Sequence, residues 1–384
     1  GTVEDLEANP DSPTGRMLAH PLPHTGTPQR RVKLNDPELK TLVFRGVHAR
    51  NLQIDEITVP LQRFTVVAGV SGSGKSTFCR EVLFENLSRR LKDAQAPLVG
   101  TDQLTGFENV GRVLEVDQTP IGKNSRSCPA TYVGIMTAIR DLYAATNEAQ
   151  ARGYDASRFS FNKAVGACPV CAGQGLRTVE MNFLPDVKVL CEACAGKRFN
   201  PETLEVLWRG KSIGDVLEME IDEAADFFAS MPSIAYPLKL MQDVGLGYLT
   251  LGQPSPTLSG GEAQRLKLVT ELAKVRTDGS FAARAPHTLY VLDEPTVGLH
   301  MTDVDRLSKV LSRLVDAGST VVVIEHNLDI AADADWIIDL GPEGGAKGGK
   351  VVAQGSPKMV ARKNTATGIV LRAFLAEHKP VKSA

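Results

Sequence analysis

The stretch Phe64-Thr-Val-Val-Ala-Gly69-Val-Ser71-Gly72-Ser-Gly74-Lys75-Ser76-Thr77 decides the fold, because an apolar strand leads into a glycine-rich loop and the start of a helix. This is the pattern of a P-loop, in which backbone N–H groups and a helix N-terminus surround the phosphates of a nucleotide. Lys75 is expected to reach the outer phosphates, and the Ser76 hydroxyl to coordinate Mg²⁺. The predicted nucleotide contacts in this loop are Gly69, Ser71, Gly72, Gly74, Lys75, Ser76 and Thr77.

Composition predicts a soluble globular chain and leaves its partners open. The chain has 384 residues, of which 42% are hydrophobic, and a formal net charge of -2. That length allows two or three domains, and a net charge so small means that any nucleic-acid surface is a local patch. No apolar run is long enough for a transmembrane helix, and no leader is recognised, so the cytoplasm is the expected location.

Polar residues follow the other strands that the sequence predicts. An acidic pair, Asp293 and Glu294, ends the strand predicted at 288–292, where the first residue can hold Mg²⁺ and the second can polarise water. Gln118 and His326 each lie two residues after a predicted strand, at 113–116 and 320–324. Each is weak evidence alone, but the ends of parallel strands meet at one edge of a sheet. Glu294, His326 and Gln118 are therefore the catalytic candidates.

A second glycine-containing stretch, Leu258-Ser259-Gly260-Gly261-Glu262-Ala263-Gln264-Arg265, precedes a helical run expected over 266–274. A serine hydroxyl and backbone N–H groups at a helix N-terminus favour an anion, as in the first loop. The further predicted nucleotide contacts are Asp293, Ser259, Gly260, Gly261 and Gln264.

Two close cysteine pairs, Cys168-Pro-Val-Cys171 and Cys191-Glu-Ala-Cys194, are separated by nineteen residues. Four thiolates at such spacing are typical of a structural tetrahedral zinc site, whereas a redox function needs only one pair. All four coordination positions are filled by protein, so the zinc is expected to stabilise structure and not to catalyse.

The region around these cysteines has a modest excess of positive charge, with eleven Lys or Arg against eight acidic residues over 112–198. Basic residues near glycines and aromatics suit contacts with DNA phosphates, although an ordinary solvated face explains the pattern equally well. The candidate DNA contacts are Lys123, Arg126, Arg177, Lys188, Lys197 and Arg198.

The first eighteen residues resemble a stretch near the other end of the chain. Gly1-Thr-Val-Glu-Asp-Leu6 with Thr14-Gly15-Arg-Met-Leu18 parallels Gly355-Ser-Pro-Lys-Met-Val360 with Thr367-Gly368-Ile-Val-Leu371. The later copy closes the predicted nucleotide-binding core, so the earlier copy is expected to close a preceding one. The proline-containing residues 19–40 are expected to form a linker, and residues 92–111 a loop.

The ordered set of P-loop, Gln118, Leu-Ser-Gly-Gly-Glu-Ala-Gln, Leu-Asp-Glu-Pro and Glu-His resembles that of an ABC-type ATPase. The cysteine-bearing insert narrows the resemblance, together with Asn182-Phe-Leu-Pro-Asp186, Leu251-Gly-Gln-Pro254 and Asp339-Leu-Gly-Pro-Glu-Gly-Gly345. With these features the chain is similar, over residues 1–376, to the C-terminal half of the UvrA family of bacterial damage-recognition proteins.

This resemblance implies an α/β fold, with an ABC-type P-loop ATPase core and an inserted helical and zinc-binding signature domain. The expected divisions are a tail and linker at 1–40, core residues 41–120 and 256–384, and the insert at 121–255. The implied function is an ATP-hydrolysing recognition subunit for DNA damage, without nuclease activity of its own. The implied cofactors are ATP, Mg²⁺ and Zn²⁺, and the implied partners are damaged double-stranded DNA, a second ABC cassette and UvrB.

The resemblance also assigns roles. Gln118 is the Q-loop residue, Asp293 and Glu294 are the Walker B pair, and His326 is the switch histidine. In ABC ATPases the signature loop, here Ser259 to Gln264, completes the nucleotide site of a facing cassette.

Three other classes share some of these motifs. UvrA-like paralogues associated with resistance to DNA-binding drugs have them all, and the long approach to Asp293 over 276–287 is unusual for repair members. A transporter ATPase predicts a short insert without zinc, which disagrees with the cysteines and the long insert. A chromosome-maintenance ATPase needs long heptad repeats, which the sequence lacks.

Overall fold

The computed structural model describes five stretches of the chain: 1–34, 36–122, 124–179, 187–274 and 287–379. The chain divides into two compact units, of which the first contains Gly1–Asp117 and Lys274–Ala384 and the second contains Gln118–Ala273. The expected insert ends at residue 255, whereas the second unit continues to residue 273.

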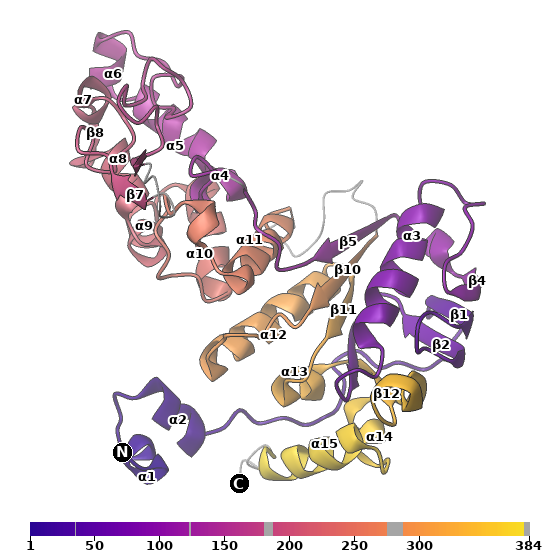
Figure 1. The fold of residues 1–384 in the computed structure, drawn as a ribbon. Helices are drawn as coiled ribbons and strands as arrows, with labels where there is room; N and C mark the ends of the chain where they lie inside the picture. The colour runs from indigo at the N-terminus through magenta and orange to yellow at the C-terminus, as the bar shows by residue number, and fades with distance from the viewer. Residues whose placement is uncertain (35, 123, 180–186, 275–286, 380–384) are drawn as a thin grey trace. The chain divides into compact units, whose positions relative to one another are not determined.

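A six-stranded sheet forms the centre of the first unit, with the strand order β13-β12-β3-β11-β10-β5 (Figure 1). In that order the strands are Lys350–Gly355, Trp336–Gly341, Phe64–Gly69, Thr320–Ile324, Thr288–Asp293 and Arg112–Val116. All neighbours are parallel except the antiparallel pair β12 and β13. Near-continuous apolar runs such as that of β3 are typical of parallel strands buried on both faces. The predicted α/β class is therefore confirmed, and so are the strands expected before Gln118, Asp293 and His326.

A second, antiparallel sheet has the order β2-β1-β4, formed by Ile54–Pro60, Thr41–Val47 and Thr101–Thr105. The last strand corrects the expectation of a loop over 92–111. The sequence of β4 is mostly polar, and only Thr101 and Leu104 are buried. Its conformation comes from pairing with β1, where Leu104 lies opposite Phe44, and this long-range contact leaves no local pattern.

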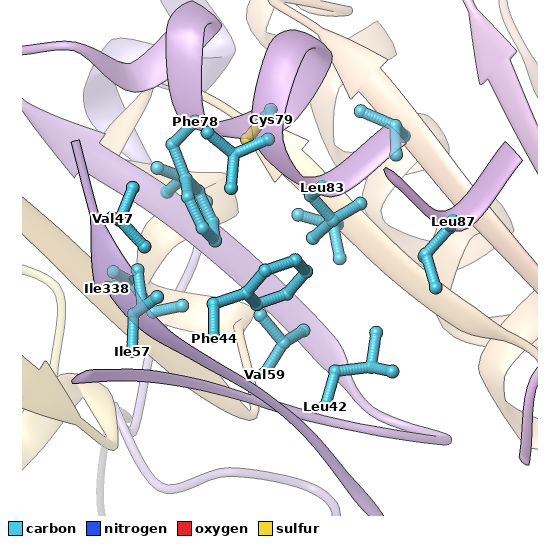
Figure 2. Close-up of a cluster of buried hydrophobic side chains, with 14 of the residues drawn as sticks. Leu42, Phe44, Val47, Ile57, Val59, Phe78, Cys79, Leu83, Leu87 and Ile338 are labelled. Carbon is cyan, nitrogen blue, oxygen red and sulfur yellow. The ribbon is translucent and has the colours of Figure 1, made fainter. Parts of the chain in front are cut away.

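The main hydrophobic core packs the helix after the P-loop against the sheets (Figure 2). The π-helix η1 (Thr77–Phe84) continues into α3 (Glu85–Arg90), so the helix whose start is predicted after the P-loop is present. Phe78 of η1 meets Phe44 of β1 edge to face, with ring centroids 5.8 Å apart. Leu83, Leu87 and Ile338 are also fully buried in this cluster. The start of η1, and with it the P-loop, is thereby fixed.

The two similar stretches of sequence fold into two similar helix pairs. They form α1 (Val3–Glu7) with α2 (Pro13–Ala19), and α14 (Pro357–Ala361) with α15 (Ala366–Glu377). In both pairs the second helix is capped alike, because Gly15 N donates to Ser12 Oγ and Gly368 N donates to Thr365 Oγ1, each at 3.0 Å. A Cβ at Gly15 would lie 1.8 Å from Leu6 O, so the first pair packs too closely for a side chain there.

His24 and Arg30 attach the segment after α2 to the first unit. His24 is 5% exposed, and its Nε2 and Nδ1 atoms lie 2.9 and 2.8 Å from carboxylate oxygens of Asp329 and Asp333. These two acids belong to α13 (Leu328–Asp333), the helix that follows His326. The Arg30 backbone N donates to the fully buried Asp335 over 2.8 Å. The expected linker is therefore bound to the first unit at His24 and Arg30.

The second unit consists of short helices and two hairpins. Its helices are α4 (Pro129–Val133), α5 (Ile135–Ala144), α6 (Asn147–Ala151), α7 (Pro201–Leu204), α8 (Ile213–Glu218), α9 (Ile221–Phe227), α10 (Pro232–Asp243) and α11 (Gly260–Leu272). The hairpins are β6 (Leu176–Val179) with β7 (Val187–Leu190), and β8 (Leu207–Trp208) with β9 (Lys211–Ser212). No helix among the described residues, in this unit or in the first, has the length and apolar character of a membrane span.

Candidate nucleotide site and candidate metal centre

The P-loop connects β3 to η1 in a conformation that requires glycine. Gly69 and Gly74 have φ angles of 135° and 101°, and a Cβ at Gly69 would lie 2.0 Å from the carbonyl oxygen of Leu340. Lys75 is 6% exposed, and its Nζ donates to the carbonyl oxygens of Gly69 and Val70, both at 2.9 Å. Burial lowers the pKa of Lys75, although Glu294 and Asp293 oppose that change. The ammonium group is thus held at the position from which it can reach a phosphate.

Two segments distant in sequence, one at Asn51 and one at 345–349, form hydrogen bonds with the backbone of the loop. Asn51 Nδ2 donates to the carbonyl oxygens of Gly72 and Gly345, each over 3.1 Å. Gly345 N also donates to Gly72 O over 3.0 Å, and Gly349 N donates to Ser73 O over 3.1 Å. In the sequence, the Asp339–Gly345 stretch is recognisable only by its resemblance to the family. Its structural role is to hold the backbone of the P-loop.

Acidic and histidine side chains gather where β10 and β11 end. Asp293 is the last residue of β10 and pairs in register with Ile324 of β11. Glu294 follows with a φ of 44°, a left-handed conformation that is uncommon for a residue with a side chain, and its N donates to Ile324 O over 2.9 Å. His326 Nε2 lies 3.7 Å from Glu294 Oε1, and both side chains are about half exposed, at 50% and 44%. Three candidate residues are therefore brought to one edge of the sheet.

Glu325 connects the loops at that edge, a role that the sequence analysis did not identify. It is 2% exposed, and its Oε1 accepts hydrogen bonds from the backbone N and the hydroxyl of Thr296 at 2.9 and 2.6 Å. Its Oε2 accepts from the backbone N of His326 and of Asn327, at 2.8 and 3.0 Å. The sequence shows a charged residue directly after an apolar strand, which could have indicated a role for Glu325. Its binding partner could not be identified, because the loop that it binds lies about thirty residues away in sequence.

The signature loop begins α11 within the second unit. Ser259 Oγ accepts from Glu262 N at 3.3 Å, and Glu262 Oε2 accepts from Ser259 N at 2.6 Å, which forms a capping box. The helix therefore begins at Gly260 and not at residue 266, as the apolar pattern alone had indicated. A Cβ at Gly260 would lie 3.1 Å from the Cβ of Gln118, so this glutamine packs beside the first turn of α11. Gln264 is buried, whereas Ser259 is exposed.

The four paired cysteines form one buried cluster in the second unit. Their sulfur atoms all lie within 4.8 Å of one another, with Cys168 Sγ to Cys191 Sγ at 3.9 Å and Cys171 Sγ to Cys194 Sγ at 3.7 Å. Four sulfurs about 2.3 Å from a tetrahedral zinc ion are about 3.8 Å apart, so this arrangement fits that metal. The pairs are followed by the same turn, because the residues after Cys171 and Cys194 all have positive φ angles: Ala172, Gly173, Ala195 and Gly196.

The candidate DNA contacts near this cluster fall into different environments. Arg177 and Lys188 are exposed on the hairpin of β6 and β7, and Arg126 is exposed while donating to Ala172 O over 2.9 Å. Lys197 binds Asp215 over 2.6 Å. Arg198 is 4% exposed and holds loops together, because its guanidinium donates to Ser125 O and Gly252 O at 2.7 and 2.6 Å.

Some sequence predictions fall outside the described residues. They are Lys123, the Asn182–Asp186 stretch and nearly all of the 276–287 approach to β10.

Comparison with known proteins gives similar sequences along nearly the whole chain. UvrABC system protein A from Thermus thermophilus is 53% identical over 376 residues, which is 98% of this chain, and the protein of that name from Aquifex aeolicus is 49% identical over 376 residues. A crystal structure of UvrA2 from Deinococcus radiodurans matches 97% of the chain with a TM-score of 0.82 and 45% identity.

The chain spans 38% of the Thermus thermophilus relative, 39% of the Aquifex aeolicus relative and 43% of the UvrA2 chain. No protein-family model matches it.

Proposed function

The chain belongs to the UvrA family, as a segment that spans 38% of the length of its Thermus thermophilus relative, and we propose that it binds and hydrolyses ATP within an excision-repair subunit. The observation that carries this proposal is the gathering of the P-loop, Asp293, Glu294 and His326 at the carboxyl ends of adjacent parallel strands. Ligands of α/β sheets bind outside such strand ends.

Each residue has a defined task in that reaction. Lys75 would leave the carbonyl oxygens of Gly69 and Val70 and bind the outer phosphates of ATP. Mg²⁺, held by Ser76 and Asp293, would supply charge neutralisation as the terminal phosphate is transferred to water. Glu294 would accept the proton of the attacking water, and His326, 3.7 Å from it, would orient that carboxylate and contact the phosphate.

The zinc module is proposed to bind DNA. Zn²⁺ held by the four cysteines would fix the turns from which the hairpin of β6 and β7 extends. Arg177 and Lys188 are the candidate phosphate contacts that this hairpin exposes. Lys123, Arg126 and Lys197 remain proposed contacts, whereas the buried Arg198 supports them by holding the 125 and 252 loops.

Complete function is proposed to require other polypeptide segments. The exposed Ser259 and the glycines after it would contact ATP bound to a second ABC cassette, as in the signature loops of ABC ATPases. The further partners proposed are damaged duplex DNA and UvrB, and DNA incision is assigned to other proteins.

Fluorescence anisotropy of labelled duplexes tests this proposal. Undamaged DNA, DNA with a bulky adduct and DNA carrying an intercalated drug are compared with and without ATP over a salt series. We expect tighter, nucleotide-dependent binding of the adduct, and Arg177→Gln should reduce the slope of log K against log salt by about 1. Arg152, which is paired with Glu148 and Glu205, provides the matched control Arg152→Gln.

Two results would contradict the proposal. Preference for the drug-bound duplex over the adduct would favour a paralogue that acts on DNA-bound drugs. Equal, nucleotide-independent binding of all three duplexes would contradict damage recognition by this segment.

A further inference from the structure

One arginine bridges two carboxylates beside the proposed nucleotide site. Arg80 lies on η1, five residues after Lys75. Its Nε lies 2.7 Å from Glu115 Oε1, and its Nη2 lies 3.0 Å from Asp293 Oδ2. Asp293 is also the residue proposed to hold Mg²⁺. One of its carboxylate oxygens is therefore already paired with a cationic side chain of the protein.

The sheet explains why these two carboxylates lie together. Strands β5 and β10 are parallel neighbours, and Glu115 lies opposite Val291 in their register. Side chains alternate between the faces of a strand, so Asp293, two residues after Val291, projects from the same face as Glu115. Two carboxylates on one face repel each other unless a cation lies between them. The helix η1 packs on this face and supplies that cation.

The helix that carries Arg80 has unusual hydrogen bonding. The segment Thr77–Phe84 is π-helical, a conformation that is rare and concentrated at functional sites. Phe78 and Cys79, which precede Arg80, are fully buried, so the backbone at this point is fixed by the core. The Arg80 side chain is 44% exposed, whereas those of Glu115 and Asp293 are 22% and 21% exposed. Arg80 is therefore anchored at its backbone and free enough at its tip to change partners.

We propose that Arg80 is a positioning residue that competes with Mg²⁺ for Asp293, and that Glu115 holds its guanidinium when the metal binds. This inference rests on the proposed ATPase function and adds a determinant of its metal requirement. In the nucleotide-free chain the guanidinium neutralises Asp293 and keeps the carboxylate in place. On binding of Mg²⁺ with ATP, Arg80 would give up its contact with Asp293 and keep its 2.7 Å contact with Glu115.

The proposal predicts opposite effects for substitutions of Arg80 and of Glu115. Removing the arginine removes the competitor, so Arg80→Gln should lower the Mg²⁺ concentration needed for half-maximal nucleotide binding by about two- to fivefold, as for a partly exposed ion pair. Removing the other acceptor leaves the guanidinium entirely to Asp293, so Glu115→Gln should raise that concentration by a similar factor. The double variant should behave like Arg80→Gln, because Glu115 acts only through the arginine.

The experiment is a magnesium titration of fluorescent, non-hydrolysable ATP analogue binding to the whole chain. It does not depend on turnover, and thermal unfolding of each variant checks that the fold is kept. Arg45 supplies a matched control, because it makes an ion pair of 2.8 Å with Glu56 in the antiparallel sheet. Arg45→Gln should leave the magnesium midpoint unchanged.

The outcomes separate this inference from the function on which it rests. Shifts in opposite directions support competition, whereas shifts in one direction, or none, overturn it and leave an ordinary structural ion pair. If the unaltered chain binds no nucleotide at any magnesium concentration, the proposed ATPase function fails and this inference fails with it.

Discussion

The nucleotide edge of the first unit and the cysteine cluster of the second are built in opposite ways. Around the P-loop, a large apolar cluster including Phe44, Phe78 and Leu83 fixes the strands and helix that carry the polar residues. Around the cysteines, the buried hydrophobic cluster among the described residues comprises the four sulfur-bearing side chains, and the hairpin beyond it is mostly exposed. The first site is thus shaped without its ligand, whereas the second is expected to depend on its metal.

Each unit also contains one tryptophan, which allows the two to be followed separately. Trp336 is buried in β12 of the first unit. Trp208 lies in β8 of the second, stacked on Phe228 with ring centroids 5.5 Å apart. Replacing either tryptophan by Phe leaves fluorescence that reports on the other unit.

The largest expected effect is loss of the metal. Cys171→Ser removes one of four ligands, and we expect zinc to be lost, with amide hydrogens of the 176–179 and 187–190 strands exchanging freely. Metal analysis and hydrogen exchange provide the measurement. Cys128→Ser is the matched control, because Cys128 is buried but lies outside the cluster. A full complement of zinc in Cys171→Ser would rule out the four-thiolate site.

The next effect concerns catalysis at the preformed edge. Glu294→Gln keeps the shape of the side chain but removes the base, so ATP turnover should fall by about 10²- to 10⁴-fold while ATP binding remains. Phosphate release and equilibrium ATP binding are measured on the same preparation. Glu56→Gln, on the exposed face of the antiparallel sheet, should turn over normally. Unaltered turnover in Glu294→Gln would assign the base to another group.

A smaller effect is expected where the edge is held together. Glu325→Gln places an amide NH₂ where carboxylate oxygens now accept four hydrogen bonds, so the first unit should lose about 1–3 kcal/mol of stability. This loss is measured by urea unfolding followed by Trp336 fluorescence in a Trp208→Phe background. In a Trp336→Phe background, the unfolding transition reported by Trp208 should not change. Equal loss in both signals would mean that the two regions are not independently stabilised.

The smallest effect is a pH dependence confined to the first unit. Burial opposes protonation of His24, but Asp329 and Asp333 together raise its pKa to about 9. The pKa is higher in the folded chain than the ordinary value of 6.5, so the stabilisation is complete below pH 6.5 and is lost as the pH rises through about 9. His24→Gln should lower the free energy of unfolding of the first unit, measured by urea unfolding followed by Trp336 fluorescence, by about 1–2 kcal/mol at pH 6 and by much less at pH 10. A deficit that is the same at both values would contradict this role of His24.

A structural feature could be predicted from the sequence when the residues that form it are close together in the chain. The P-loop, the strands before Asp293 and His326, and the cysteine pairs each rest on contiguous residues or fixed spacing, so the α/β class and the candidate metal cluster could be predicted. Strand β4 was missed because its conformation comes from pairing with β1, more than fifty residues earlier.

The contacts that complete the sites are long-range and left no local pattern. Glu325 binds the loop at Thr296. Arg80 meets both Glu115 and Asp293 because β5 and β10 are neighbours in the sheet. Arg198 looked like a surface cation, but its carbonyl partners lie 73 and 54 residues away. Such pairings follow from strand order and loop packing, which periodicity and motif spacing do not specify.

The nucleotide site is best tested by equilibrium binding of magnesium and ATP before and after zinc removal. We expect saturable binding to a single site per chain in both states, abolished by Lys75→Ala, because the nucleotide edge is shaped by the core of the first unit. Absence of binding in the zinc-loaded chain, or binding that survives Lys75→Ala, would contradict the assignment of the P-loop edge as the nucleotide site.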